Sequence, residues 1–400
     1  MLSPRIPVIY GAAAIGAPGT FCALTNTEQA QRVVDALFDP GVEPQPELRQ
    51  KIISLNDADD GHGDSSGLVR EPVSLYAIDT SNVHTENSCF SFQILAQMDL
   101  HGCVIDTKFY PLVPGDHARV KLREAFDRML ASLGDKRVRV LYLNAPDHAT
   151  PFSETFAAMD ELHKEGKFEM LGLSNYRTHE VGEIVTLCRA NGWVVPAVYQ
   201  GLYNAIDRMV ESELLPCLRQ FGIKFAAYGP LAGGYLVGDL LFEPEPSRVR
   251  LHLDLPPSAA IVDHLLPSVN DLRQSLRGSG RHFDSRNPFS AWYQSRYLNS
   301  RINNAVFRLC AVLKLYGLSL HEASLRWLQH HSALVPSDLG MIFGGRTPDQ
   351  VKQTLTYCTY GPLPDVILEA FEECYTEIRG GLPGFWMHPA WDDRLRENSQ

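Results

Sequence analysis

The stretch 138–234 contains four short apolar runs that each end in polar or small residues: 138-VRVLYLNAPDHATP-151, 168-FEMLGLSNY-176, 194-VVPAVYQGLYNAI-206 and 223-IKFAAYGPLAGG-234. One helical segment is expected between each pair of consecutive runs. In each, apolar residues recur at helical spacing and a glycine follows, the usual signal for the end of a helix. The three sets are Phe156, Met159 and Leu162 before Gly166; Val181, Ile184, Val185 and Cys188 before Gly192; and Val210, Leu214, Leu215, Leu218 and Phe221 before Gly222. Strand and helix alternating about every thirty residues is typical of βα units around a parallel sheet.

Polar residues stand at the carboxyl end of these runs. They are Asn144, Ser174, Asn175, Gln200 and Tyr228. In a (β/α)8 TIM barrel, that end of the strands forms the active-site face. A single residue of this kind is equally well explained as a helix cap or a loop hydrogen-bonding group, but five together favour a bound ligand.

Length and charge exclude several classes of protein. The 400 residues carry a formal net charge of −11, which argues against a general partner of nucleic acid or of anionic membranes. The sequence has no long uncharged apolar run, and its N-terminus lacks the pattern of a signal peptide. We expect residues 1–400 to form a single α/β barrel domain that acts on a small molecule in the cytoplasm.

The eight cysteines are expected to be buried free thiols in a reducing cytosol. None belongs to a CxxC pair, so neither a structural zinc site nor any other metal site is expected. They are Cys22, Cys89, Cys103, Cys188, Cys217, Cys310, Cys358 and Cys374.

Three segments depart from a minimal barrel. Residues 38–72 are rich in Pro, Asp, Gly and Ser and are interpreted as a surface insertion on the face away from the chemistry. Residues 243–280 follow the seventh strand, which places this insertion on the active-site face as a lid or substrate loop. The tail 380–400 contains Phe385, Trp386, His388 and Trp391, and either packs on the barrel wall or folds over the pocket.

The remaining elements complete the barrel. Residues 5–16 are predicted as the first strand, 27–37 as the first helix, 303–331 as a helical pair, and 341–350 as the eighth strand running into a helix.

Two further runs end in charged residues. Residues 73–79 are a predicted strand ending at Asp79, and residues 103–110 are a predicted strand with Lys108 at its end. Lone charges at strand ends are usually solvated. A charge pair at the mouth of a closed barrel favours a functional role, because burial without a partner is costly there.

The motifs YLNAPDHATP, GKFEMLGLSNY, NGW, VYQGLYNAI and PLAGGYLVGD resemble the aldo-keto reductases, and among them the aflatoxin-aldehyde-reductase branch. The resemblance is strong over 105–238, resumes over 281–364, and is weaker in the first hundred residues. It implies a (β/α)8 barrel that binds NADPH without a Rossmann motif and reduces aldehydes and ketones by hydride transfer. Relatives occur as monomers and homodimers.

The resemblance also implies a catalytic tetrad, of which two members are changed here. Asp79 with Thr80 matches the family's Asp-Thr, and Lys108 matches the catalytic lysine. The tyrosine expected five residues after the aspartate is His84, and the histidine of the Tyr-Leu-His-Ala-Pro-Asp motif is Asn144.

His84 is the candidate proton donor in this altered site. Hydride delivery to a carbonyl leaves an alkoxide that a nearby acid must protonate. Imidazolium is a competent acid near neutral pH, and Asp79 would favour that form while Lys108 would disfavour it. Asn144 can donate an amide hydrogen bond but cannot shuttle protons. Among other histidines, His148 is a reserve proton donor near the barrel top.

The cofactor-binding positions of the family are better kept. Ser174, Asn175 and Gln200 match the contacts to the nicotinamide carboxamide, and Tyr228 matches the ring that stacks on nicotinamide. The other matching positions are Pro230, Leu231, Gly233, Gly344, Arg346, Thr347 and Gln350. In this last group Arg346 would hold the 2′-phosphate by forked hydrogen bonds. The Glu-Asn pair of the family is replaced by Gln353 and Thr354, and the basic residue after the first-strand glycines is absent at Ala17 and Pro18.

Three functions remain open at this stage. The first is an NADPH-dependent reductase with a rebuilt acid, acting on a bulky carbonyl or a conjugated alkene, since family members that lack the tetrad histidine turn toward C=C reduction. The second is a non-redox isomerase, dehydratase or cyclase that reuses the pocket. The third is a non-catalytic subunit that senses NADP(H). The insertions and the aromatic tail favour a specialised substrate of secondary metabolism. We expect His117, His148 and His179 at the surface.

Overall fold

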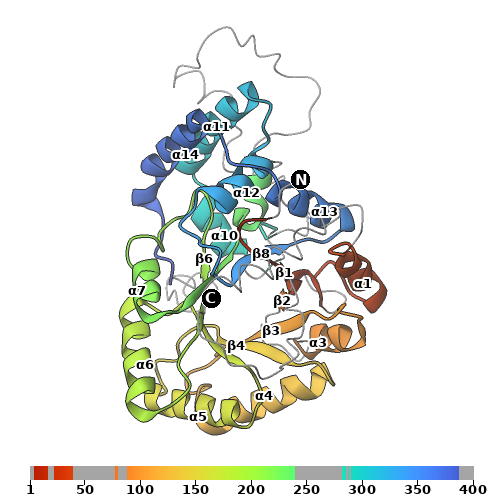
Figure 1. Cartoon of the computed structure of the whole chain (residues 1–400), viewed down its shortest axis with the longest axis vertical. Helices are drawn as coiled ribbons and strands as arrows, with labels where there is room; N and C mark the ends of the chain where they lie inside the picture. The colour runs from red at the N-terminus through yellow and green to blue at the C-terminus, as the bar shows by residue number, and fades with distance from the viewer. Residues whose placement is uncertain are drawn as a thin grey trace, which may run out of the picture.

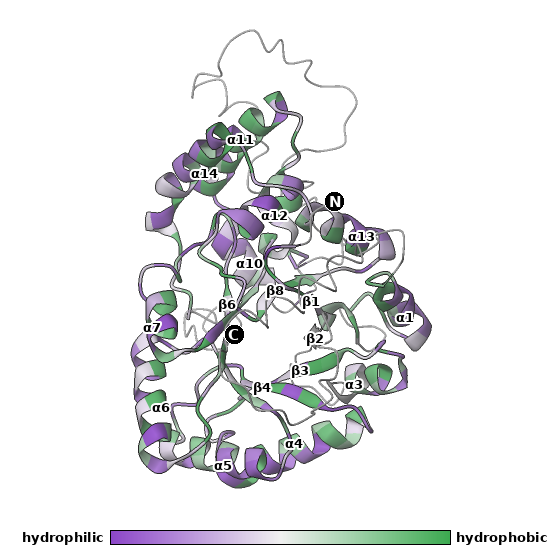
Figure 2. Ribbon diagram, viewed as in Figure 1, coloured by the Kyte–Doolittle hydropathy of each residue, from purple (hydrophilic) through white to green (hydrophobic). Residues whose placement is uncertain are grey.

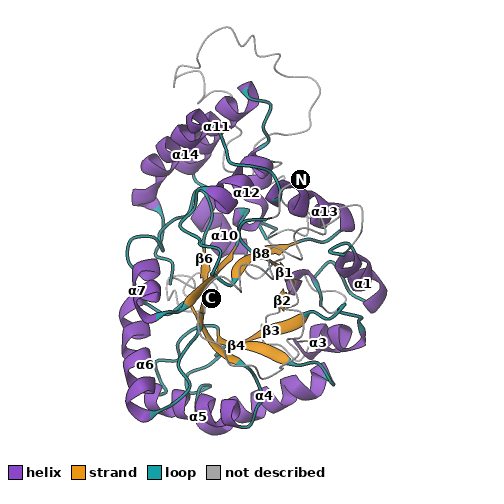
Figure 3. Ribbon diagram, viewed as in Figure 1, coloured by secondary structure: helices purple, strands orange, loops and turns teal. Residues whose placement is uncertain are grey.

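The computed structural model describes residues 4–16, 22–38, 77–79, 88–238, 282–284, 287 and 290–386, with the side chains of 77–79 and 88–90 excepted. Eight parallel strands form a closed barrel in the order of the chain, as the (β/α)8 prediction requires (Figures 1 and 3). The strands are β1 (Val8–Gly11), β2 (Ala77–Asp79), β3 (Val104–Phe109), β4 (Val138–Leu143), β5 (Met170–Ser174), β6 (Val198–Leu202), β7 (Lys224–Tyr228) and β8 (Gly340–Gly344).

Helices surround the barrel, and Figure 1 shows α11 and α14 lying together at one end of the molecule. The α-helices are α1 (Thr27–Asp35), α3 (Ser88–Gln97), α4 (Arg119–Leu133), α5 (Phe152–Lys164), α6 (Thr178–Asn191), α7 (Leu214–Phe221), α10 (Ser290–Tyr297), α11 (Ser300–Leu315), α12 (Leu320–His330), α13 (Pro348–Cys358) and α14 (Asp365–Ile378). The 3-10 helices are η1 (Ala12–Ala14), η2 (Ala232–Val237) and η3 (Arg379–Gly381).

The barrel closes where β1 pairs with β8. Ile9 lies opposite Ile342 and Gly11 opposite Gly344 in this pair. Gly340 begins β8 with a φ of 139°, and a Cβ there would lie 2.5 Å from the carbonyl oxygen of Pro7. Only glycine fits this approach, so the residue at position 340 is fixed by closure itself.

The strands bury both of their faces. One set of side chains packs inside the barrel as a small cluster that includes Val140, Tyr142, Val198, Ala226 and Ile342. The opposite set joins the larger core beneath the helices. The helices alternate hydrophobic and hydrophilic residues along their length (Figure 2), as expected when one face covers a sheet.

A glycine on β5 makes room for the largest residue inside the barrel. A Cβ on Gly172 would lie 2.2 Å from Cδ1 of Tyr142, so the aromatic ring of Tyr142 lies directly over the bare backbone of β5. A side chain at position 172 would displace the ring from the barrel centre.

Most predicted elements are confirmed, and two boundaries are corrected. The first strand is shorter than the predicted 5–16, because η1 follows directly on Gly11. The helix expected after Arg208 begins at Leu214, and Val210 is buried in the turn before it. Pro216 explains the late start: it has no N–H to donate, and its ring obstructs the carbonyl four residues earlier.

The two predicted insertions lie outside the described residues, apart from Phe38. The aromatic tail is described as far as Trp386, and this part contacts α10 and the N-terminus of α6. Phe385 is buried in the large core, and the Trp386 ring lies 5.7 Å from the Arg177 guanidinium at the start of α6.

The prediction of buried free thiols is confirmed for four of the seven described cysteines. All seven are free thiols, but Cys22, Cys103 and Cys217 are only half-buried. Burial raises the pKa of Cys188, Cys310, Cys358 and Cys374 to about 12, which makes these thiols unreactive near neutral pH. Within the described residues, no helix is long and apolar enough to cross a membrane, and no cluster of metal-ligating side chains occurs.

A buried ion pair joins three segments on one side of the barrel. The Arg296 guanidinium of α10 donates two hydrogen bonds to Asp207, at 2.5 and 3.2 Å, and both residues are 1% exposed. Arg296 also donates to the carbonyl oxygen of Pro383 at the start of the tail, 3.0 Å away. The Tyr297 hydroxyl donates to the same carboxylate at 3.2 Å. The loop after β6, helix α10 and the tail are thereby fixed to one another.

Removing one member of this pair should be severe. Arg296→Met leaves the Asp207 carboxylate buried without its cation, and we expect a loss of about 3–5 kcal/mol in the free energy of unfolding. The double variant Arg296→Met with Asp207→Asn should recover part of that loss, because no uncompensated charge remains. Thermal unfolding of the three proteins measures both effects, with Arg32→Met on the exposed face of α1 as the control. Equal melting temperatures for wild type and Arg296→Met would contradict this role.

Candidate active site

The polar residues predicted at the strand ends lie together around the mouth of the barrel. Side chains alternate between the two faces along a strand. Lys108, Ser174, Gln200 and Tyr228 lie two or four residues beyond inner-cluster residues Val104, Met170, Val198 and Ala226, and therefore face the barrel interior. Ser174 is the register partner of Gln200, and Leu202 is that of Tyr228.

Lys108 is buried beside an aromatic ring that the sequence analysis did not single out. Its side chain lies on β3 at 5% exposure, and its Nζ is 5.7 Å from the ring centroid of Tyr142. A tyrosine ring attracts an ammonium group through its negative face. Tyr142 stands two residues before Asn144, so strand alternation alone would have placed it beneath the rim.

A second ion pair lies one step deeper on β3. Arg139 donates to both oxygens of Asp106, at 2.8 and 2.5 Å, and Asp106 is buried. The register of β3 and β4 slips by one residue here, and Arg139 is the extra residue of a β-bulge. Val138 consequently packs in the outer core and Val140 in the inner cluster, although strict alternation would give them the same face.

Asn144 and Asn175 connect the ends of three strands. The Asn144 backbone N–H donates to the carbonyl oxygen of Phe109 at 2.8 Å. Asn175 Nδ2 donates to the carbonyl oxygen of Asn144 at 2.7 Å and to Ser174 Oγ at 3.2 Å. Asn175 has a φ of 61°, a left-handed conformation that a side chain seldom adopts. These bonds direct the Nδ2 of Asn175 into the protein, so its oxygen is the atom suited to an amide ligand.

Asp147 joins the two loops that follow β3 and β4. Its carboxylate accepts hydrogen bonds from the backbone N–H groups of Gly115, His117 and Ala149 at 2.9–3.0 Å, and from Thr150 Oγ1 at 2.7 Å. Burial acts to raise the pKa of Asp147, but these hydrogen bonds outweigh it and hold the pKa below its ordinary value. Sequence reasoning missed this residue, although an aspartate that follows Ala-Pro is a common turn signal.

The histidines of these loops divide into buried and exposed. His148 and His179 are exposed as predicted, and His148 Nε2 lies 2.6 Å from Glu180 Oε1. The surface prediction for His117 is wrong, because its side chain is 1% exposed against the ring of Phe109. His117 Nε2 is buried and has no hydrogen-bond partner among the described residues.

The predicted cofactor positions occupy the other side of the mouth. Tyr228 is half-buried at the end of β7, and Pro230, Leu231 and Gly233 follow it. Gly233 has a φ of 67° and lies against the ring of Tyr293 from α10. The loop after β7 therefore requires glycine at position 233, because glycine tolerates the positive φ and a side chain would collide with the Tyr293 ring.

Arg346 lies half-buried in the loop between β8 and α13. Thr347 caps α13 by accepting a hydrogen bond from the Gln350 N–H at 3.3 Å, while Gln350 Oε1 accepts one from the Arg346 N–H at 2.8 Å. Arg346 immediately precedes the N-cap residue Thr347, and a cation next to a helix N-terminus is a combination that suits a phosphate. The exposed Gly344 precedes them, and a Cβ there would lie 3.9 Å from the carbonyl oxygen of Gly11.

These residues fit NADP(H) as the bound group. Ser174, Asn175 and Gln200 offer hydroxyl and amide groups at the rim, Tyr228 offers a ring face, and Arg346 offers a cation for a phosphate. The substituted positions in α13 do not add to the site: Thr354 is buried, and Gln353 Nε2 donates to the Tyr357 hydroxyl of the same helix.

For the other two predicted tetrad members, Asp79 and His84, the structure describes only the backbone of Asp79. The backbone of Asp79 ends β2 and pairs with Gly11 of β1 and Asp106 of β3, which puts it beside Lys108's strand. Thr80, His84, Ala17 and Pro18 lie outside the described residues.

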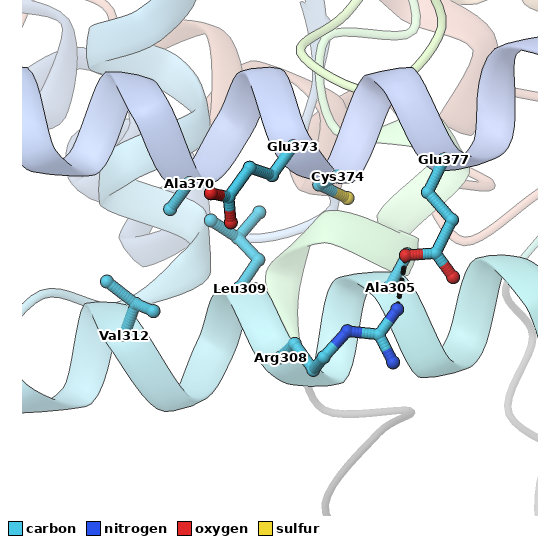
Figure 4. Close-up of a pocket in the computed structure, with 8 residues that line it drawn as sticks. All are labelled: Ala305, Arg308, Leu309, Val312, Ala370, Glu373, Cys374 and Glu377. Carbon is cyan, nitrogen blue, oxygen red and sulfur yellow. Dashed lines mark hydrogen bonds and ion pairs between the residues drawn. The ribbon is translucent and has the colours of Figure 1, made fainter. Parts of the chain in front are cut away.

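Two depressions elsewhere on the molecule are distinct from this mouth. A small pocket between α11 and α14 is bounded by Ala305 and Ala370, whose short side chains leave a gap beside the Arg308–Glu377 ion pair (Figure 4). An open groove between α6 and α7 is lined by Arg177, Cys217 and Trp386. The first is a gap in helix packing and shares no residue with the barrel mouth.

The buried His117 should make the protein sensitive to acid. Burial lowers its pKa to about 4, against the opposing effect of Asp147 and Asp116, so the folded protein holds it neutral. The unfolded chain protonates this histidine near pH 6.5, so folding stability falls as pH drops from about 6.5 to 4. The difference in pKa corresponds to about 3 kcal/mol.

His117→Phe keeps the ring and removes the titrating group. Denaturant unfolding of wild type and His117→Phe between pH 7.5 and 4 should show a steeper loss of stability for wild type, with the exposed His179→Phe as control. Parallel pH profiles for wild type and His117→Phe would show that His117 does not titrate as described.

Comparison with known proteins identifies the family. Residues 75–376 match the model of the Aldo/keto reductase family. The chain is 38% identical to Aflatoxin B1 aldehyde reductase member 2 of Rattus norvegicus over 270 residues, which cover 66% of this chain and 65% of that protein. It is 36% identical to Aldo-keto reductase family 7 member A3 of Homo sapiens over 287 residues, 70% of this chain and 78% of the relative.

A third relative matches over nearly the full length of both proteins. Aldo-keto reductase pigE of Monascus ruber is 27% identical over 390 residues, 94% of this chain and 95% of that protein. The family match over residues 75–376 contains the strand ends from β2 to β8 that form the mouth. The chain belongs to the aldo/keto reductase family.

Proposed function

We propose that this protein binds NADPH at the barrel mouth and reduces a carbonyl or conjugated alkene of a bulky small molecule. The observation that carries the proposal is the placement of Arg346 at the N-terminus of α13, on the same rim as Ser174, Gln200 and Tyr228. Arg346 suits a phosphate of the cofactor. Its nicotinamide is suited by the polar and aromatic groups of Ser174, Gln200 and Tyr228. Family membership supports the same activity.

The bound cofactor supplies a hydride to the carbon that is reduced. The residues of the chain position the two reactants and manage charge. Ser174, Asn175 and Gln200 orient the carboxamide, and Tyr228 covers one ring face. The buried ammonium of Lys108 stabilises negative charge that develops on the substrate oxygen, an effect that is strong where water is excluded.

The proposed proton donor is His84. An imidazolium there protonates the substrate oxygen, and its proton is restored from solvent. Asn144 lies at the adjacent strand end and donates an amide hydrogen bond to the same oxygen. An amide polarises an oxygen but exchanges no proton. Conjugated alkenes are included among the proposed substrates because family members that lack the tetrad histidine, matched here by Asn144, turn toward C=C reduction.

Apolar side chains at the mouth support a bulky apolar substrate. Leu112 and Val113 follow β3 and are 47% and 51% exposed, and Val120 at the start of α4 is also exposed. Exposed apolar groups of this size on an active-site loop are suited to an apolar ligand. The rat and human relatives named for aflatoxin B1 aldehyde are consistent with a large substrate, and we place the substrate of this chain in secondary metabolism.

Binding of NADPH and NADH by the purified protein tests the proposal. Quenching of tryptophan fluorescence should show tight NADPH binding and weaker NADH binding. Arg346→Gln removes the forked cation, so we expect NADPH affinity to fall about 10–100-fold, while NADH affinity stays within about twofold.

Arg32→Gln, on the exposed face of α1, is the matched control and should bind both cofactors as wild type does. Loss of affinity for both cofactors in Arg346→Gln would place Arg346 away from the 2′-phosphate. Failure of wild type to bind either cofactor would overturn the reductase proposal.

A further inference from the structure

The segment before α10 places an imidazole beside the predicted cofactor loop. The ring of His282 stacks on the ring of Tyr293, with centroids 4.7 Å apart and planes inclined by 26°. Tyr293 in turn lies against Gly233, because a Cβ there would come within 2.5 Å of Tyr293 Cε1. His282 is therefore separated by one aromatic ring from the loop that follows β7.

One nitrogen of this imidazole has no hydrogen-bond partner in the described part of the chain. Nδ1 of His282 is buried there without a hydrogen-bond partner. A buried polar atom of this kind is costly and calls for an explanation, such as a ligand that completes it. Stacking on Tyr293 fixes the orientation of the His282 ring. The fold therefore holds Nδ1 at a place where no described residue bonds it.

The charges around His282 favour an anionic ligand. Arg346 approaches from the loop between β8 and α13, and burial together with this guanidinium lowers the pKa of His282 to about 4. Among the described residues, the Tyr293 phenol ring of α10 stacks on His282, and the buried Asp284 stands two residues further along the chain. Arg346 disfavours the charged form of His282, and an anion bound beside both side chains would offset that effect.

We propose that His282 donates a hydrogen bond to a phosphate oxygen of the bound dinucleotide, in company with Arg346. This inference rests on the proposed NADPH site and adds a second phosphate-binding residue to it. Phosphate oxygens accept such charge-assisted bonds strongly.

The contact links cofactor binding to a proton. Without ligand, His282 is neutral at pH 7. A phosphate beside it neutralises Arg346 and favours imidazolium, so binding takes up a proton from solvent. Affinity for the cofactor should therefore be highest at low pH and should fall as the pH rises above about 4, the pKa of His282 in the unliganded protein.

Calorimetric titration of the full chain with NADPH tests this linkage. Titrations at pH 6.5 in two buffers of different ionisation enthalpy measure the number of protons taken up. Wild type should take up a substantial fraction of a proton. His282→Phe keeps the stack on Tyr293 but should lose the uptake and bind NADPH about tenfold more weakly. His282→Asn retains a donor near the position of Nδ1 and should recover part of the affinity without the uptake.

The control is His179→Phe on the exposed face of α6, which should behave as wild type. Uptake with NADPH but not NADH assigns the contact to the 2′-phosphate, and uptake with both assigns it to the pyrophosphate. Unchanged affinity and unchanged uptake in His282→Phe, with its circular dichroism intact, would overturn the inference while leaving the NADPH site standing. Absence of NADPH binding by wild type would overturn the proposed function itself.

Discussion

Pairing of β1 with β8 is the constraint on which the rest of the structure depends. It makes the sheet a closed ring, so the carboxyl ends of all eight strands meet at one mouth. Gly340 permits this closure by its backbone conformation and its contact with Pro7. Closure explains why Lys108 and Gln200, far apart in the chain, become neighbours of one site.

The two sides of the mouth are fixed in different ways. On the side of β3 and β4, hydrogen bonds to Asp147 join two loops, and the ring of Tyr142 supports Lys108. On the side of β6 and β7, the Asp207–Arg296 pair connects a loop to α10, which carries Tyr293 against the glycine turn. The side of β6 and β7, which is held by the Asp207–Arg296 ion pair, suits a cofactor. The side of β3, where Leu112 and Val113 are exposed, suits a variable substrate.

The rim residues could be predicted from the sequence because apolar runs that end in polar groups report strand ends directly. The same logic misses features set by contacts between loops. The buried His117 is held through its backbone N–H by a carboxylate 30 residues later in the chain. The partnership of Asp106 with Arg139 depends on a bulge that breaks strand alternation, and the late start of α7 depends on Pro216 overriding an apolar pattern. In the first two cases a contact between segments overrides a local sequence rule, whereas the effect of Pro216 is itself local.

The central claim is that the barrel mouth transfers hydride from NADPH to a bound substrate. The most direct measurement is deuterium transfer from C4-deuterated NADPH to a panel of apolar aldehydes and enones, with products analysed by mass spectrometry for wild type, His84→Tyr and Asn144→His. The account predicts one deuterium on the reduced carbon of at least one wild-type product, and faster aldehyde reduction in the variants that restore the family's residues. NADPH binding without label in any product, even in the double variant His84→Tyr with Asn144→His, would contradict it.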